Sequence, residues 1–297
     1  MTHFETRSGF VSVVGRPNVG KSTLVNALVG HKVAITSARP QTTRNTIRGV
    51  LTLPEERAQL VLVDTPGIHK PRTALGERLN TLVYGSLAEA DAALFVIDAT
   101  QPIGPGDRLI AERLKEAQVP VVLAVNKVDI ADREAILLQL TASAGFDFEA
   151  YVPISAKRHD GTELVVNELV ALLSPGPFFF PEDARSDQPD SFLAGEIVRE
   201  KYLARLREEL PHSLAVVVDE METDAKGMLR ISATAYVERE SQKGMAIGKG
   251  GSMIKAVGTD AREDLEHLFG TKVFLDLRVK VEKDWQRSDE MLDRLGF

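Results

Sequence analysis

Short apolar runs alternate with helical patterns along the first 174 residues. The runs are nearly continuous and rich in β-branched residues, which predicts strands buried on both faces of a mainly parallel sheet. Between them, apolar residues three and four positions apart predict helices on either side. The expected strands are 10–14, 60–63, 93–97, 121–125 and 151–154, and the expected helices include 21–29, 75–87, 108–117 and 163–173. This alternation predicts a doubly wound α/β domain.

The pattern changes at residue 174, where Pro175, Gly176 and Pro177 interrupt the regular elements. With the polar run 181–189 they predict a linker. We expect the three phenylalanines at 178–180 to pack onto one of the domains, because free ones would be unusual.

A smaller α+β unit is expected beyond the linker. Its predicted elements are helix 196–210, strands 214–218 and 229–237, a helix, then helix 253–268, strand 272–281 and a last helix 284–295. We divide the chain into a first domain over 1–176, a linker over 177–192 and a second domain over 193–297.

Composition narrows the class of protein. The 297 residues include no cysteine, which excludes disulfides, thiolate metal sites and cysteine nucleophiles. Since no apolar run approaches 18 residues and the N-terminus is polar, we expect a soluble, cytoplasmic protein. The net charge is −7, without the bulk basicity of a non-specific nucleic-acid binder, so any nucleic-acid site must be local.

The chemistry begins directly after the first expected strand, where residues 15–22 match the phosphate-binding pattern G-x-x-x-x-G-K-[ST]. The glycines let successive backbone N–H groups face one concavity that fits phosphate oxygens. The following helix adds the positive end of its dipole. Lys21 would bridge the outer phosphates, and Ser22 would ligate Mg²⁺. The nucleotide contacts expected here are Gly15, Arg16, Pro17, Asn18, Val19, Gly20, Lys21, Ser22 and Thr23.

A second motif, D-x-x-G, follows the second expected strand and consists of Asp64, Thr65, Pro66 and Gly67. Its carboxylate can hold Mg²⁺ through water, and the Gly67 N–H can reach the γ-phosphate. The polar loop 36–44 can bring a threonine to the same ion, closing over the nucleotide and loosening after hydrolysis. Thr43 is the first choice for that ligand and Thr42 the second. The expected metal ligands are Ser22, Thr43 and Asp64.

The base is indicated by a third motif, which consists of Asn126, Lys127, Val128 and Asp129. The Asp129 carboxylate can accept from both N1–H and the 2-amino group of guanine. Adenine lacks these donors and would leave a buried carboxylate unpaired, which costs much more than a missing methylene. A further loop is expected to cap guanine from the other side with Ser155, Ala156 and Lys157. The pattern therefore favours GTP.

The strings at 15–22, 41–44 and 64–67 resemble those of the Era family of bacterial GTPases. The resemblance covers the whole chain, because it implies a P-loop GTPase G domain followed by a type II KH RNA-binding domain. It also implies binding to the 3′ region of 16S ribosomal RNA and a role in assembly of the small ribosomal subunit. We expect a slow GTPase that is a monomer.

The KH domain has a signal of its own at residues 247–254, which contain the sequence G-x-x-G. In KH domains this loop clamps the backbone of about four nucleotides while the bases lie in an adjoining groove. The range 239–255 contains four basic residues and only one acidic residue, Glu240, so its local charge is positive. The expected RNA contacts are Arg239, Lys243, Gly248, Lys249, Gly250, Gly251 and Lys255.

Ile68 occupies the position at which Ras-like proteins carry the glutamine that orients the attacking water. The resemblance implies a substitute, since related GTPases with a hydrophobic residue there use a monovalent cation held by an asparagine of the phosphate loop. Asn18 stands at that position, and K⁺ would neutralise charge on the leaving oxygens. The nucleotide contacts thus include Ile68, and the expected catalytic residues are Asn18, Lys21, Thr43 and Gly67.

The sequence is also compatible with two other functions. One is an RNA-binding chaperone or checkpoint protein in which nucleotide binding matters more than turnover. The other is a signalling switch whose second domain binds a protein. The last helix also leaves open a weak peripheral contact with the cytoplasmic face of the membrane, but the acids around Trp285 favour packing onto the second domain. The charges within 196–209 are expected on a solvated helix face.

Overall fold

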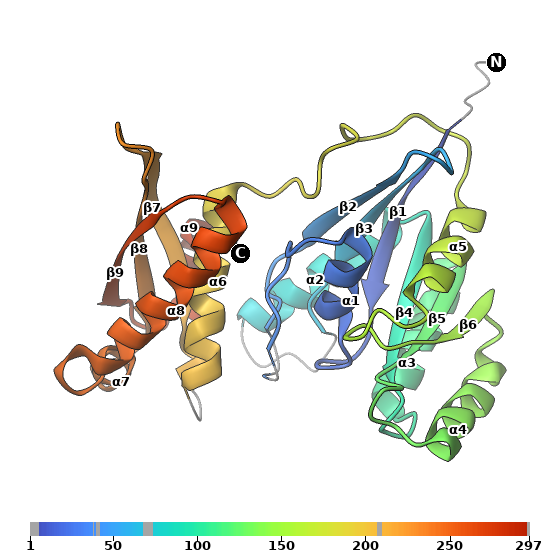
Figure 1. The fold of residues 1–297 in the computed structure, drawn as a ribbon. Helices are drawn as coiled ribbons and strands as arrows, with labels where there is room; N and C mark the ends of the chain where they lie inside the picture. Colours follow the sequence, from blue (N-terminus) through green and yellow to red (C-terminus); the bar gives the residue numbers. More distant parts are fainter. Residues whose placement is uncertain (1–5, 38, 40–41, 68–73, 207–209, 296–297) are drawn as a thin grey trace. The chain divides into compact units, whose positions relative to one another are not determined.

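The computed structural model describes residues 6–37, 39, 42–67, 74–206 and 210–295 (Figure 1). It divides into two compact units, one made of most of residues 1–187 and one made of 188–297 with the short segments 35–42 and 72–75. The first unit therefore includes much of the predicted linker, and the predicted domain limits stay a prediction. None of the described helices is long and apolar enough to cross a membrane.

A six-stranded sheet forms the centre of the first unit, in the order β2-β3-β1-β4-β5-β6. Neighbouring strands are parallel, except that β2 and β3 pair antiparallel. The five predicted strands and the mainly parallel sheet are confirmed. The strands are β1 (Arg7–Val14), β2 (Ile47–Leu53), β3 (Ala58–Asp64), β4 (Ala92–Asp98), β5 (Val121–Asn126) and β6 (Ala150–Pro153).

Helices cover both faces of this sheet (Figure 1). Side chains alternate between the two faces of a strand, so Leu94 and Phe95 of β4 belong to different cores. The core around Leu94 includes α1 (Lys21–Val29) and α5 (Thr162–Leu172). The core around Phe95 includes α2 (Ala74–Ala88), α3 (Pro105–Ala117) and part of α4 (Arg133–Ser143). The doubly wound arrangement is therefore confirmed.

Among the described residues of this unit, the expected strands leave out β2, and helix α4 is not among the helices named from the sequence. The edge strand β2 has its apolar run interrupted by Arg48 and Gly49, which leaves too short a run for detection. Helix α4 keeps Leu137 and Leu138 exposed, and these leucines obscure the apolar stripe by which an amphipathic helix is recognised.

The carboxyl ends of the parallel strands place polar residues at one edge of the sheet. Strand β3 ends at Asp64, β4 ends at Asp98 and β5 ends at Asn126. The register pairs Asp98 with Asn126 and Val13 with Asp64. Ligands of open α/β sheets bind outside the carboxyl ends of the strands, so this edge is where a site is expected.

The second unit has the predicted order of helix, strand, strand, helix, helix, strand around a core of its own. Strand β8 pairs antiparallel with β7 and parallel with β9. Helix α6 follows Pro189 directly and thus begins before the predicted residue 196. The elements are α6 (Asp190–Arg205), β7 (Ala215–Thr223), β8 (Leu229–Val237), α7 (Glu240–Ile247), α8 (Ser252–Phe269), β9 (Val273–Val281) and α9 (Asp289–Arg294).

The end of the chain packs into the second unit. Trp285 is fully buried, and its Nε1 donates to the Ser213 carbonyl at 3.0 Å. Leu292 of α9 is also fully buried. The predicted helix 284–295 is divided into a 3₁₀ turn and α9, whose first turn is capped by Ser288. Packing, rather than a membrane-facing surface, therefore accounts for these apolar side chains.

Three charged side chains of α6 are buried, so the prediction that its charges lie on a solvated face is wrong for them. Arg199 is 1% exposed, pairs with Glu196 at 2.7 Å and donates to the Thr42 carbonyl. Glu200 accepts from the Thr36 N–H at 2.8 Å. Each buried charge has hydrogen-bond partners, and such partners are what make its burial tolerable. A helical charge pattern alone does not reveal them.

The segment after α5 is fixed to the first unit by Gln59, which is fully buried in β3. Its Nε2 donates to Thr52 Oγ1 and to the Phe180 carbonyl, both at 2.9 Å. Its Oε1 accepts from the Phe179 and Phe180 N–H groups at 2.8 and 3.0 Å. The Phe179 ring lies 4.8 Å from that of Phe10, so the expected packing of this segment onto a domain is confirmed.

Replacement of this glutamine tests how strongly the segment is held. Gln59→Met keeps a similar volume but leaves two N–H groups and a carbonyl of residues 179–180 unpaired. We expect the free energy of unfolding of the first unit to fall by about 2–3 kcal/mol, measured by urea unfolding of the whole chain. The exposed Gln101→Met is the matched control and should change it by at most about 0.5 kcal/mol. Equal stability of the two variants would contradict this role.

Candidate functional site

The phosphate loop between β1 and α1 requires glycine at two positions. Gly20 has a φ of 103°, and a Cβ there would lie 2.3 Å from Asn126 Nδ2. A Cβ on Gly15 would lie 2.4 Å from the Val96 carbonyl oxygen. Helix α1 begins at Lys21 without a side-chain cap, so its first N–H groups face the loop, as an anion site at a helix N-terminus requires.

The three predicted metal ligands lie together. Ser22 Oγ donates to Asp64 Oδ2 at 2.6 Å and lies 2.9 Å from Thr43 Oγ1. Thr43 Oγ1 lies 3.4 Å from the same carboxylate oxygen. The alternative, Thr42, instead donates to the Arg39 carbonyl at 2.7 Å. The structure thus brings Thr43, and not Thr42, to Ser22 and Asp64.

Burial dominates the electrostatics of this cluster. It raises the pKa of Asp64 above its ordinary value, although Lys21 and the hydroxyls of Ser22 and Thr43 oppose the shift. It also lowers the pKa of Lys21 to about 8, against the attraction of Asp64. Asp64 Oδ1 is buried without a hydrogen-bond partner among the described residues. An unsatisfied carboxylate oxygen beside two hydroxyl groups provides oxygen ligands of the kind that Mg²⁺ prefers.

The residues predicted to bind the base converge at the ends of β5 and β6. Asn126 joins two loops, because its Nδ2 donates to the Val19 carbonyl at 2.8 Å and its Oδ1 accepts from the Ala156 N–H at 2.9 Å. Asp129 accepts from Ser155 Oγ at 2.8 Å. The third motif and the 155–157 loop are therefore joined to the phosphate loop by hydrogen bonds.

The D-x-x-G motif approaches the same loop. Thr65 Oγ1 donates to the Val13 carbonyl at 2.8 Å. A Cβ on Gly67 would lie 2.8 Å from the Pro17 nitrogen, so the two motifs meet backbone to backbone. Ile68 lies outside the described residues, and its place in the site stays a prediction.

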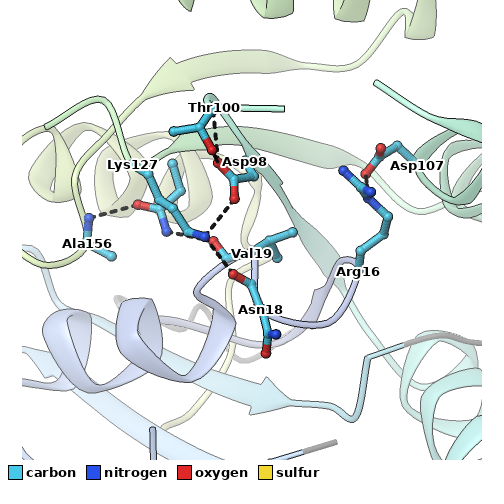
Figure 2. Close-up of polar contacts among 9 residues, drawn as sticks. Arg16, Asn18, Val19, Asp98, Thr100, Asp107, Lys127 and Ala156 are labelled. Atoms are coloured by element: carbon cyan, nitrogen blue, oxygen red, sulfur yellow. Dashed lines mark hydrogen bonds and ion pairs between the residues drawn. The ribbon is translucent and has the colours of Figure 1, made fainter. Parts of the chain in front are cut away.

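Two carboxylates that no motif predicts, those of Asp98 and Asp107, contact predicted residues of this site. Lys127 Nζ donates to the Asn18 carbonyl at 2.8 Å and to Asp98 Oδ2 at 2.6 Å (Figure 2). Arg16 Nε pairs with Asp107 at 2.8 Å. Asp98 ends a buried parallel strand, as Asp64 does, and this shared position is the signal that could have revealed it.

In the second unit, the G-x-x-G loop joins α7 to α8. Gly248 has a φ of 76°, and a Cβ there would lie 2.7 Å from the Met253 nitrogen, so this position requires glycine. The Gly251 N–H donates to the Gly248 carbonyl at 3.0 Å, which closes the turn. The loop residues Lys249 and Gly250 are exposed. Of the flanking cations, Arg239 and Lys255 are exposed and Lys243 is half-buried.

A groove of about 450 Å³ lies between α8 and β9. The Phe274 ring on β9 is half exposed, and the Arg230 guanidinium lies 5.2 Å from its centre. Exposed aromatic rings beside cations are the surfaces on which unpaired bases stack. Lys255, which follows the G-x-x-G loop, lines the groove with Ile254, Thr259, Phe274, Leu275 and Leu277.

Comparison with known proteins agrees with both units. A family described as 50S ribosome-binding GTPase matches residues 10–127, and the KH domain family matches residues 209–286. The chain is 50% identical over 303 residues to the GTPase Era of Mycolicibacterium paratuberculosis, with all of both chains covered. This chain belongs to the Era family of GTPases. The family member of Mycobacterium tuberculosis is 49% identical over 304 residues, again with full coverage.

Two crystal structures of Era proteins have the same fold, each with a TM-score of 0.94 and 39% identity. Each match covers 98% of this chain and 99% of the other. One is Era in complex with MgGDPNP and nucleotides 1506–1542 of 16S ribosomal RNA. The other is an Aquifex aeolicus Era variant bound to GDP and AlF4⁻. The expected P-loop GTPase and KH folds are therefore confirmed.

We expect that the base preference can be reversed at Asp129. Xanthine carries a carbonyl where guanine has its 2-amino group, and Asp129→Asn replaces one acceptor by a donor that matches it. We expect the affinity for GTP to fall by about a hundredfold while that for xanthosine triphosphate rises, because two charge-assisted hydrogen bonds are lost. Competition against a fluorescent nucleotide measures both. Asp132→Asn, at the nearby cap of α4, should bind as wild type. A wild-type protein that binds ATP as tightly as GTP would contradict the assignment.

Proposed function

We propose that the chain binds GTP at the carboxyl edge of the six-stranded sheet and that its KH domain binds ribosomal RNA. The main support for the nucleotide site is that Ser22, Thr43 and Asp64 lie together at one end of the phosphate loop. At the other end Asn126 and Asp129 adjoin the same loop and its neighbour. These two groups of side chains match the phosphates and the base of one nucleotide.

Lys21 is the main cation for the phosphates. Its Nζ donates to the Gly15 and Arg16 carbonyls at 3.1 and 3.2 Å, and these weak bonds would give way to phosphate oxygens. Negative phosphates would also restore the pKa of this buried ammonium toward its ordinary value. Phosphoryl transfer depends mainly on positioning and on stabilising charge. We propose Asn18, Lys21, Thr43 and Gly67 as the catalytic residues, with Gly67 donating its N–H to the γ-phosphate.

Ser22, Thr43 and Asp64 would hold Mg²⁺, the ion present with GDPNP in the related Era complex. When bound, this ion neutralises charge on the β- and γ-phosphates. Thr43 lies near the end of the polar loop 36–44. Its hydroxyl therefore makes the position of that loop dependent on the nucleotide, as in GTPases whose loops are ordered by the γ-phosphate.

We further propose that hydrolysis is slow and assisted by K⁺. The aliphatic Ile68 cannot orient water, so charge on the leaving oxygens needs another partner. The Asn18 amide offers a carbonyl oxygen, the kind of ligand that replaces water around K⁺. Asn18 has a φ of 64°, and this conformation is tolerated by asparagine better than by most residues.

For RNA, we propose that the G-x-x-G loop holds the backbone while the groove between α8 and β9 receives the bases. The related Era complex contains nucleotides 1506–1542 of 16S ribosomal RNA. We infer that the same 3′ region is the target here and that the protein acts in assembly of the small ribosomal subunit. We place it in the cytoplasm as a monomer. Since Trp285 and Leu292 are buried, we propose no membrane contact.

The cation proposal is tested by replacing Na⁺ with K⁺ at equal ionic strength. We expect K⁺ to raise the rate of phosphate release by about tenfold, as expected for an added charge at the developing oxyanion. Asn18→Gly should abolish the difference while GDP affinity stays near wild type, because glycine adopts the same positive φ without strain. Equal wild-type rates in the two salts would remove this proposal and leave the nucleotide site intact.

The RNA proposal is tested by the double variant Lys249→Asp and Gly250→Asp. Two carboxylates would face RNA phosphates, and we expect binding of a 16S 3′-end oligonucleotide at physiological salt to fall by about a hundredfold or more. Gly250 has a φ of 61°, which aspartate tolerates better than most residues, and a Cβ there meets no atom within 4 Å, so the fold should survive. Basal GTP hydrolysis should remain near wild type, since its residues lie in the other unit.

The chain offers a matched control in the turn between β7 and β8. Lys226 and Gly227 are exposed, and Gly227 also has a positive φ and open space around its Cα. Changing both to aspartate makes the same change in charge away from the G-x-x-G loop, so most of the RNA affinity should remain. If the Lys249 and Gly250 variant binds RNA as tightly as wild type, the loop is a structural turn and the RNA proposal fails.

A further inference from the structure

Residues 16–18 of the phosphate loop are held from two sides by carboxylates that lie outside every nucleotide-binding motif (Figure 2). On one side Arg16 reaches Asp107, and on the other Lys127 joins the Asn18 carbonyl to Asp98. Asn18 between them has a φ of 64°. A non-glycine residue keeps such a conformation where the surrounding structure over-determines it.

The Asp98 side is held by hydrogen bonds within the protein. Asp98 is 3% exposed, and its Oδ1 accepts from the Thr100 N–H at 2.9 Å and from Thr100 Oγ1 at 2.6 Å. This leaves Oδ2 for Lys127 Nζ at 2.6 Å. Burial opposes ionisation of Asp98, but the hydrogen bonds from Lys127 and Thr100 outweigh it and hold its pKa below the ordinary value.

The strand register explains why these groups meet. Asp98 lies beside Asn126 at the ends of β4 and β5, and Lys127 is the next residue. Lys127 has a φ of 72°, which turns the chain away from the strand. The sheet thus fixes the carboxylate and the ammonium, and the ammonium in turn fixes a carbonyl of the phosphate loop.

The Asp107 side connects the loop to α3. Asp107 is 1% exposed, and its Oδ2 accepts from the Gly104 N–H at 2.9 Å at the start of the helix. Its Oδ1 accepts from Arg16 Nε at 2.8 Å. A Cβ on Gly106 would lie 3.0 Å from Arg16 Cδ, so the absence of a side chain there lets the arginine stem approach. One carboxylate therefore both caps α3 and anchors the loop.

We propose that Asp98 and Asp107 are positioning residues that hold residues 16–18 in the shape that receives the phosphates, and that they thereby slow nucleotide release. Neither carboxylate needs to touch the nucleotide. Asp98 acts through Lys127, which binds the Asn18 carbonyl. Asp107 acts through Arg16 on the peptide units that precede Asn18. Because charge-assisted hydrogen bonds are the stronger ones, neutralising either acid loosens the loop without removing a nucleotide contact. The inference rests on the proposed nucleotide site.

The test is the rate at which a fluorescent GDP analogue leaves the full-length protein. We expect Asp98→Asn and Asp107→Asn each to speed release by about tenfold, the loss expected for one charge-assisted hydrogen bond. Asp91→Asn is the control for β4, since Asp91 accepts from the Phe10 N–H at the opposite end of that strand. Glu116→Gln is the control for α3, because its partner Arg113 lies on the exposed side of the helix. Both controls should release the nucleotide as wild type does.

A double-variant cycle separates positioning from a general loss of stability. In a Lys127→Met background, which keeps the aliphatic stem and removes the ammonium, Asp98→Asn should change release by less than about twofold. Should Asp98→Asn not fold, Thr100→Val keeps the carboxylate but removes one hydrogen bond, and it should speed release by about threefold.

Unchanged release in folded Asp98→Asn or Thr100→Val would overturn the Asp98 part, and unchanged release in Asp107→Asn would overturn the other. The Asp98 part would also be overturned if Asp98→Asn sped release as much in the Lys127→Met background as in wild type. The effect would then not depend on Lys127. Failure of wild type to bind GDP at all would instead refute the nucleotide site on which both parts rest.

Discussion

Asp64 is fully buried at the end of β3, and its carboxylate meets the hydroxyls of Ser22 and Thr43. A buried charge is tolerated where partners surround it, and here the partners come from segments far apart in the sequence. The phosphate loop supplies Ser22 together with Lys21, and the polar loop after α1 supplies Thr43. The unsatisfied Oδ1 and the lowered pKa of Lys21 show that the protein alone balances these charges incompletely. We propose that Mg²⁺ and the nucleotide phosphates complete this balance.

The parallel sheet brings several polar residues to the same place. Each strand that ends at the same edge can deliver one polar residue, and Asp64, Asp98 and Asn126 occupy equivalent positions on β3, β4 and β5. Asp64 contacts Ser22 and Thr43, Asn126 joins the phosphate loop to the 155–157 loop, and Asp98 holds Lys127 on the phosphate loop. In the KH domain, by contrast, the RNA contacts that we propose depend on a glycine turn at Gly248 and on exposed cations rather than on buried charge.

Much of this was predictable because it is local. The helix after Lys21, the strand over Leu229–Val237 and the glycines of both loops follow from short-range patterns. The antiparallel edge strand β2 was missed since Gly49 interrupts its apolar run, and the buried charges of α6 were misread because their partners lie about 160 residues away, as for Arg199 and Thr42. Asp98 and Asp107 were missed because their partners, Lys127 and Arg16, lie 29 and 91 residues away. A carboxylate that acts through another side chain leaves no spacing by which a motif is recognised.

Calorimetric titration of GDPNP with and without Mg²⁺ tests most directly the proposal that Ser22, Thr43 and Asp64 form one metal-dependent nucleotide cluster. Wild type should bind at least about tenfold more tightly with Mg²⁺ than with EDTA. Ser22→Ala should lose most of that difference, whereas Ser37→Ala, in the polar loop but outside the cluster, should keep it. Equal affinity of wild type with and without Mg²⁺, or an unchanged Mg²⁺ effect in Ser22→Ala, would contradict the account.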